Sequence, residues 1–103
     1  TINVGNNGAS DYTLSGTDRN GSVSGNDPAL AFNNGDVVDF VVSASGHPFW
    51  IKTAQVTGTG SGATGVSNNG TQSGTVQWTV GSTGTFYYIC QYHAGMVGTI
   101  TAS

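Results

Sequence analysis

Apolar and polar residues alternate in short runs along most of this 103-residue chain, as they do in half-buried β-strands. No stretch is rich in strong helix formers. The predicted inward-facing positions of the clearest strands are Ile2 and Val4, Tyr12 and Leu14, Leu30 and Phe32, Val38, Phe40 and Val42, Val76, Trp78 and Val80, and Ile100 and Ala102. About seven or eight strands, with turns about every 8–12 residues, indicate an all-β sandwich. We expect residues 1–103 to form a single domain.

The first half of the chain contains the best-defined pair of strands. Pro28 opens one segment, residues 33–36 (Asn-Asn-Gly-Asp) form a turn sequence, and residues 37–42 follow as the strongest strand. Asn and Gly tolerate positive φ, so we predict a hairpin at this turn. Residues 15–27 have hardly an apolar anchor and predict a loop or a weak edge strand, whereas residues 57–70 predict a neutral loop.

Two further segments place chemically interesting side chains. In the run that starts at His47, the period of two puts His47, Phe49 and Ile51 on one inward face and Trp50 on the outer face. Near the C-terminus the same period puts Cys90 on the inward face of a strand, at its end.

Charge is sparse, because only 7% of the residues are charged and the formal net charge is −3. Two basic side chains provide no surface for nucleic acid or for an anionic membrane. No apolar run approaches the roughly 20 residues that a membrane-spanning helix needs. We therefore expect a monomer whose partners dock through an apolar surface, with no nucleic acid and no membrane span.

The stretch 90–96 (Cys-Gln-Tyr-His-Ala-Gly-Met) holds the only cysteine, the only methionine and one of the two histidines. The other histidine, His47, lies 43 positions before Cys90. If the fold brings His47 to this stretch, then His47, Cys90 and His93 with a weak axial Met96 form the donor set of a mononuclear copper electron-transfer centre. We therefore predict that this chain binds one copper ion.

Each of these residues alone has an ordinary explanation. A buried free cysteine is usually a small apolar filler, and a lone histidine or methionine is usually a surface or core side chain. Together, however, they use every thiolate, imidazole and thioether in the chain. Zinc favours four strong ligands, and iron–sulfur clusters need more cysteines, so copper is the metal that fits.

The chain resembles the cupredoxins, and within them the plastocyanin and amicyanin groups. The resemblance is carried by residues 32–36 before the strongest strand, by Gly46-His47, by residues 84–90 leading to the cysteine, and by residues 94–98 around Met96. The short Cys-x₂-His-x₂-Met spacing is similar to that of amicyanin. The resemblance implies a Greek-key β-sandwich, one Cu(I)/Cu(II) ion bound by these four residues, and one-electron transport without enzymatic turnover.

The resemblance also implies redox partners and a cellular place. The partners would be a c-type cytochrome, a photosystem, or a copper or haem oxidase. The place would be extracytoplasmic: the periplasm, the thylakoid lumen or the cell surface. No signal peptide is visible in the sequence, and we expect a mature or excised domain.

Two departures from the family pattern concern the surroundings of the copper ligands. The family usually has Asn after the upstream histidine, and its backbone N–H donates to the ligand sulfur; Pro48 has no N–H. We hypothesise that the Tyr92 N–H takes over this hydrogen bond. The short loop also leaves Ala94, Gly95 and Val97 around His93, with Pro48 nearby. We predict that partners dock on these four residues and that electrons pass through the His93 ring edge.

Other functions remain open from the sequence. The Gly/Ser/Thr/Asn-rich composition also fits a non-redox β-sandwich that serves as a surface or interaction module. A copper delivery protein is a further alternative, although such proteins usually carry additional Met, His or Cys residues. An enzyme is not expected, because a Cys90–His93 nucleophile pair would lack a third orienting group.

Overall fold

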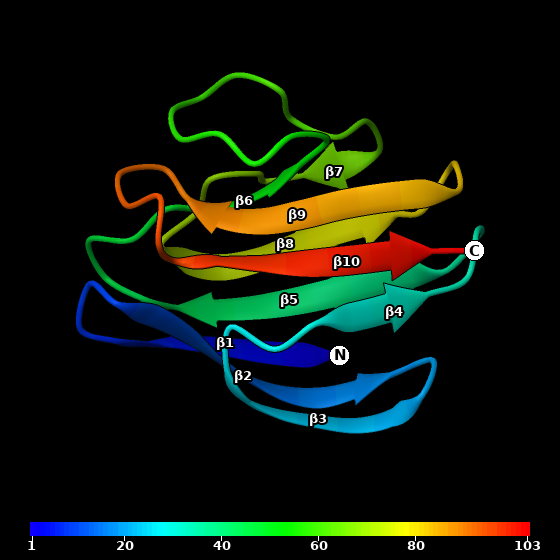
Figure 1. Ribbon diagram of the computed structural model, residues 1–103, viewed down its shortest axis with the longest axis horizontal. Helices are drawn as coiled ribbons and strands as arrows, with labels where there is room; N and C mark the ends of the chain where they lie inside the picture. Colours follow the sequence, from blue (N-terminus) through cyan, green and yellow to red (C-terminus); the bar gives the residue numbers. More distant parts are fainter.

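The alternating segments form ten strands that pack as two sheets face to face, without helices (Figure 1). The computed structural model describes all of residues 1–103. The strands are β1 (Ile2–Asn7), β2 (Asp11–Asp18), β3 (Gly21–Asn26), β4 (Leu30–Phe32), β5 (Val37–Ser43), β6 (Phe49–Lys52), β7 (Val66–Ser67), β8 (Ser73–Thr79), β9 (Gly84–Cys90) and β10 (Val97–Ala102). The predicted all-β sandwich is therefore confirmed.

The two sheets have different sizes. One has six strands in the order β3-β2-β1-β5-β8-β7, and the other has four in the order β4-β10-β9-β6. Neighbouring strands are antiparallel except for β1 with β5 and β10 with β4, which are parallel. No helix in the structure could cross a membrane.

The space between the sheets is filled by the predicted inward-facing side chains. On β5, Phe40 is fully buried, whereas Val37 and Val41 on the other face are 60% and 41% exposed. Aromatic rings form much of the core: Phe49 packs against both Tyr12 and Phe40, with ring centroids 5.1 and 5.2 Å apart. Period-two alternation along the strands thus determines which side chains enter the core.

The predicted hairpin between β4 and β5 is wrong. β4 pairs with β10 in one sheet, whereas β5 pairs with β1 and β8 in the other, so residues 33–36 carry the chain from sheet to sheet. The turn itself forms as expected, with the Asp36 N–H donating to the Asn33 carbonyl at 3.0 Å. Crossing between sheets lets both strands bury their apolar faces in the shared core, and the rings of Phe32 and Phe40 meet there with centroids 6.3 Å apart.

For residues 15–27, the second of the two predicted alternatives, a weak edge strand, is confirmed. β2 continues to Asp18 and pairs with β3 in register from Thr13–Asn26 to Asp18–Gly21. β3 is the last strand of its sheet and buries little, so its residues can be polar. Backbone hydrogen bonds to β2 hold β3 at the edge of the sheet, so its side chains need not alternate between apolar and polar residues.

Residues 57–70 mostly form a loop, as predicted, and together with residues 53–56 this 53–70 loop lies along the free edge of β6. Asn69 pairs with the backbone of Ile51 through both its side-chain oxygen, at 2.8 Å, and its side-chain nitrogen, at 3.0 Å. Beneath the loop, Lys52 is fully buried and its Nζ donates to the Gly58 carbonyl at 2.7 Å. Burial lowers the pKa of Lys52. The loop therefore covers an edge that would otherwise expose unpaired backbone groups.

The loop approaches Trp50 closely at Gly70. A Cβ at Gly70 would lie 2.8 Å from the Trp50 ring, and the backbone there has φ +89°. At Gly35, with φ +94°, a Cβ would meet nothing within 4 Å. The two glycines thus share a left-handed backbone but differ in the space around them.

We expect Gly70→Ala to destabilise the protein more than Gly35→Ala. Gly35→Ala carries only the backbone strain, about 1–2 kcal/mol. Gly70→Ala adds an overpacking cost of about 1–3 kcal/mol against the indole ring. Urea unfolding measures the free energies, and Trp fluorescence reports whether the indole has moved. Equal destabilisation by the two variants would show that the loop does not rest on Trp50.

Candidate metal centre

The antiparallel pair β6–β9 positions the predicted ligands. Phe49, the first residue of β6, is the register partner of Cys90, the last residue of β9. His47 lies two residues before Phe49, so the pairing brings it to the end of the strand that carries Cys90. His93 and Met96 lie in the short connection between β9 and β10, which starts from the same end of the sandwich (Figure 1).

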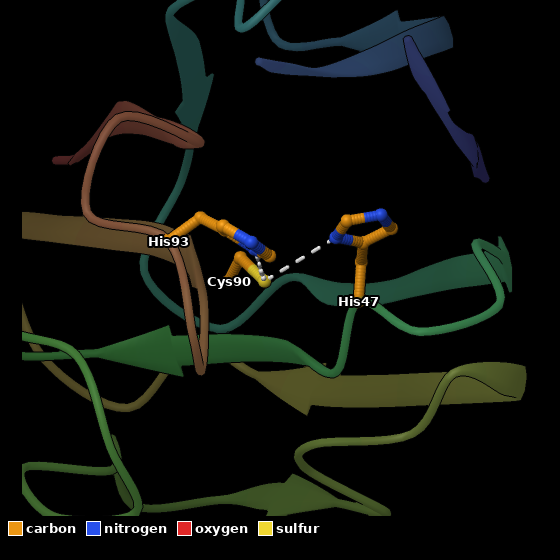
Figure 2. Close-up of side chains that lie close together, drawn as sticks. All are labelled: His47, Cys90 and His93. Carbon is orange, nitrogen blue, oxygen red and sulfur yellow. Dashed lines mark hydrogen bonds between the residues drawn. The ribbon is translucent and has the colours of Figure 1, made fainter. Parts of the chain in front are cut away.

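Figure 2 shows that the two imidazoles approach the cysteine sulfur from different segments of the chain. Cys90 Sγ lies 3.7 Å from His47 Nδ1 and 3.4 Å from His93 Nδ1. One donor atom from each residue lies within 4.8 Å of the other two. The structure therefore brings these three predicted residues to one point.

These distances fit a single metal ion between the three donors. With metal–ligand distances of about 2.0–2.3 Å and angles of about 110–120°, nitrogen and sulfur would be roughly 3.5–3.8 Å apart. The observed separations of 3.4 and 3.7 Å are close to this range. The donor set of two imidazole nitrogens and one thiolate suits copper in both oxidation states. Met96 is fully buried, its backbone bonds to both Cys90 and His93, and its thioether would be the fourth donor to such an ion.

Backbone hydrogen bonds fold the 91–96 connection tightly. The Cys90 N–H donates to the Met96 carbonyl at 3.0 Å, and the Met96 N–H donates to the His93 carbonyl at 3.1 Å. The upstream ligand is held similarly, since the His47 N–H donates to the Ala44 carbonyl at 2.9 Å. Cys90 is fully buried, whereas both histidines are half-buried. The site is thus preformed and lies just below the surface.

Gln91, next to Cys90, connects three parts of the chain. Its N–H donates to the Pro48 carbonyl at 3.1 Å, its carbonyl accepts from the Gly58 N–H at 2.9 Å, and its side-chain oxygen accepts from Trp50 Nε1 at 3.0 Å. These contacts could not be predicted from the sequence, because each joins residues that are far apart in the chain. Gln91 therefore fixes the ligand connection to β6 and to the 53–70 loop.

Tyr12 is a second residue whose role near the site was missed. It lies at the start of β2, is fully buried, and its hydroxyl donates to the His47 carbonyl at 2.8 Å. Burial, followed by the neighbouring Cys90, raises the pKa of Tyr12. The residue type alone could have indicated such a contact, because a tyrosine that faces the core needs a hydrogen-bond partner for its hydroxyl.

The residues predicted to surround the ligands fall into different classes of exposure. Pro48 is buried, so it adds little to a docking surface, which corrects that part of the expectation. Ala94 and Gly95 are exposed and Val97 is half-buried. The predicted hydrogen bond from the Tyr92 N–H to Cys90 Sγ is not among those in the structure, and the Tyr92 side chain is 62% exposed.

Solved structures share the architecture of this chain, although no family model and no curated protein sequence matches it. The copper protein rusticyanin aligns with a TM-score of 0.64 at 20% identity, over 99% of this chain and 76% of that one. Reduced rusticyanin aligns with a TM-score of 0.57 at 19% identity, over 99% and 77%. Auracyanin B aligns with a TM-score of 0.50 at 21% identity, over 98% and 86%.

At such low identities the likeness concerns the fold. The chain has the cupredoxin fold, as its resemblance to that family implied. At one end of this fold, the donor atoms of His47, Cys90 and His93 are grouped as a mononuclear type 1 copper site requires, and Met96 lies buried in the same short connection as His93.

One ionisable group near Tyr12 should affect stability. The Tyr12 N–H donates to Asp27 Oδ1 at 2.9 Å, and the Asp27 N–H donates to the Tyr12 carbonyl at 2.8 Å. Burial, together with the neighbouring Asp11 carboxyl group, raises the pKa of Asp27 from 3.8 to about 6, against the opposing effect of the Tyr12 N–H. The folded state thus binds this proton more tightly than the unfolded state does.

We expect the stabilisation associated with the Asp27 proton to be fully present below about pH 4 and to be lost as the pH rises through about 6. Asp27→Asn keeps an oxygen that can accept the Tyr12 N–H but cannot ionise. The unfolding free energy of the variant minus that of the wild type should therefore increase between these pH values. Urea unfolding of the copper-free proteins at several pH values measures it. Asp27 has a positive φ of 45°, which Asn also tolerates, and any gain in stability from this backbone effect would be the same at every pH. Parallel pH profiles of the two proteins would therefore contradict a raised pKa for Asp27.

Proposed function

We propose that this protein is a small one-electron carrier that uses the copper site described above. Copper supplies the one-electron change between Cu(II) and Cu(I). The observation that carries the proposal is the convergence of His47, Cys90 and His93 from two distant segments onto one point. Both segments are held by hydrogen bonds, so little rearrangement should accompany a change in the charge of the site.

The chain's own residues have distinct tasks in this function. Cys90 is fully buried, which keeps its thiolate away from water and from exogenous oxidants. His93 is half-buried and is flanked by the exposed residue Ala94, and its ring edge would be the route by which electrons reach a partner. Met96 is fully buried, and its thioether would be the remaining donor to the ion.

The alternatives explain less of the structure. A non-redox interaction module leaves the grouping of these donors without a reason. Copper delivery requires ready exchange of the ion, whereas Cys90 and Met96 are both fully buried. For an enzyme, an ion held by His47, Cys90, His93 and Met96 would have all four of these donors and so little room to bind a substrate. We therefore favour a carrier over these alternatives.

The test of copper binding is titration of the copper-free protein with Cu(II). We expect one equivalent to bind and to give an intense visible band, because a thiolate–Cu(II) bond absorbs strongly by charge transfer. Cys90→Ser, a similarly small side chain at a buried position, should abolish the band while far-UV circular dichroism stays unchanged. A wild-type protein that remains colourless with Cu(II), or that cannot be cycled by voltammetry, would refute the proposal.

We further propose that partners dock at the end of the sandwich where His93 lies. No charged residue occurs in 43–51 or in 91–97, the segments that carry the ligands. An uncharged surface suits transient association with a c-type cytochrome, a photosystem, or a copper or haem oxidase. These partners, and an extracytoplasmic location for the encounter, stay predictions from the family resemblance.

Electron self-exchange tests the docking surface without a known partner. Two copies must approach through their His93 ends, so we expect Ala94→Glu to lower the self-exchange rate at low salt by placing like charges in contact. Thr75→Glu, at an exposed position of β8, adds the same charge elsewhere. NMR line broadening in mixtures of the oxidised and reduced protein measures the rate. An equal decrease in both variants would argue for net charge and against this surface.

A further inference from the structure

Tyr12 is held both by backbone hydrogen bonds and by packing of its ring. Its backbone N–H and carbonyl both form hydrogen bonds with Asp27, at 2.9 and 2.8 Å. Its ring meets Phe49 edge-on, with centroids 5.1 Å apart and an interplanar angle of 77°. The position of the phenol oxygen is thus determined by the backbone at one end and by packing along the ring.

The Tyr12 hydroxyl reaches the metal centre from a part of the chain that supplies no ligand. It donates to the carbonyl of His47 at 2.8 Å, across 35 positions of sequence. This carbonyl belongs to the residue whose Nδ1 lies 3.7 Å from Cys90 Sγ. Figure 1 shows the start of β2 at the same end of the sandwich as the ligand segments.

The backbone around His47 needs such support. Residues 44–48 form no strand, Gly46 has φ +84°, and Pro48 has no N–H with which to hold the segment. The His47 N–H is bonded within its own turn, to the Ala44 carbonyl. The Tyr12 hydroxyl is the contact that ties the peptide unit after His47 to the six-stranded sheet.

We propose that Tyr12 is a positioning residue of the copper centre: its hydroxyl fixes the His47 peptide, and so sets the orientation of the His47 imidazole relative to the Cys90 sulfur. This inference deepens the proposed function and rests on it. Without the hydroxyl, the His47 carbonyl loses its partner and the ring can rotate. The bond between copper and the Cys90 thiolate then changes, because both donors share one ion.

The chain offers a matched control for this idea. Tyr88 is also fully buried, and its hydroxyl donates to the Pro28 carbonyl at 2.6 Å. Tyr12→Phe and Tyr88→Phe each remove one buried hydroxyl and leave one backbone carbonyl without its partner. Only the first carbonyl belongs to a copper ligand, so a purely structural role for both tyrosines predicts equal effects on the site.

The experiment compares the two variants with the wild type, with and without copper. In the copper-loaded proteins, Tyr12→Phe should shift the energy of the visible band, the copper hyperfine splitting in the EPR spectrum and the reduction potential, and Tyr88→Phe should shift none of them. In the copper-free proteins, the carbonyl ¹³C resonance of His47 should move upfield in Tyr12→Phe only, because that carbonyl no longer accepts a hydrogen bond. Urea unfolding verifies that both variants fold.

Two outcomes would overturn the proposal: unchanged copper spectra and potential in Tyr12→Phe, or equal shifts in both variants. The copper-free measurement separates this inference from the function on which it rests. If the wild type fails to bind Cu(II), the proposed function fails. The His47 resonance then decides alone: its shift in Tyr12→Phe supports positioning of His47 by Tyr12, and an unchanged resonance overturns it.

Discussion

The register between β6 and β9 is the constraint on which the metal centre depends. Phe49 lies opposite Cys90, which brings His47 and Cys90 to the same end of the four-stranded sheet. Since side chains alternate between the two faces of a strand, a slip of one residue would turn Cys90 away from the core. Burial of Phe49 and Tyr88, whose rings stack with centroids 5.6 Å apart, opposes such a slip. The hydrophobic core therefore determines the ligand geometry.

The sequence predicted those parts of the fold that the alternation of side chains records. Val38, Phe40 and Val42 entered the core as expected, because burial on one face demands apolar residues at every second position. The pairing of β4 and β5 was predicted wrongly, since a tight turn is compatible both with a hairpin and with a crossing between sheets. For residues 15–27 the sequence left a loop and a weak edge strand open, because an edge strand held by its backbone needs no apolar pattern; the edge strand β3 is the one that forms.

The ligand set could be inferred from the sequence because copper restricts the choice of donors, and the chain has one cysteine, one methionine and two histidines. The supporting contacts could not. Tyr12, Trp50 and Gln91 support the site through hydrogen bonds that span 33 or more positions, and only the folded chain brings these groups together. Pro48 was expected near the surface, but its place directly before β6 buries it.

The parallel pairing of β1 with β5 and of β10 with β4 determines where the two ends of the chain lie relative to the copper ligands. β10 ends at the side of the sandwich opposite the copper ligands, and β1 begins opposite the middle of β5 and runs toward the ligands, so a chain extended from either terminus would lead to that opposite side (Figure 1). A tether or a neighbouring domain joined at either terminus would emerge there. The end of the sandwich that carries the copper ligands would then stay accessible to redox partners.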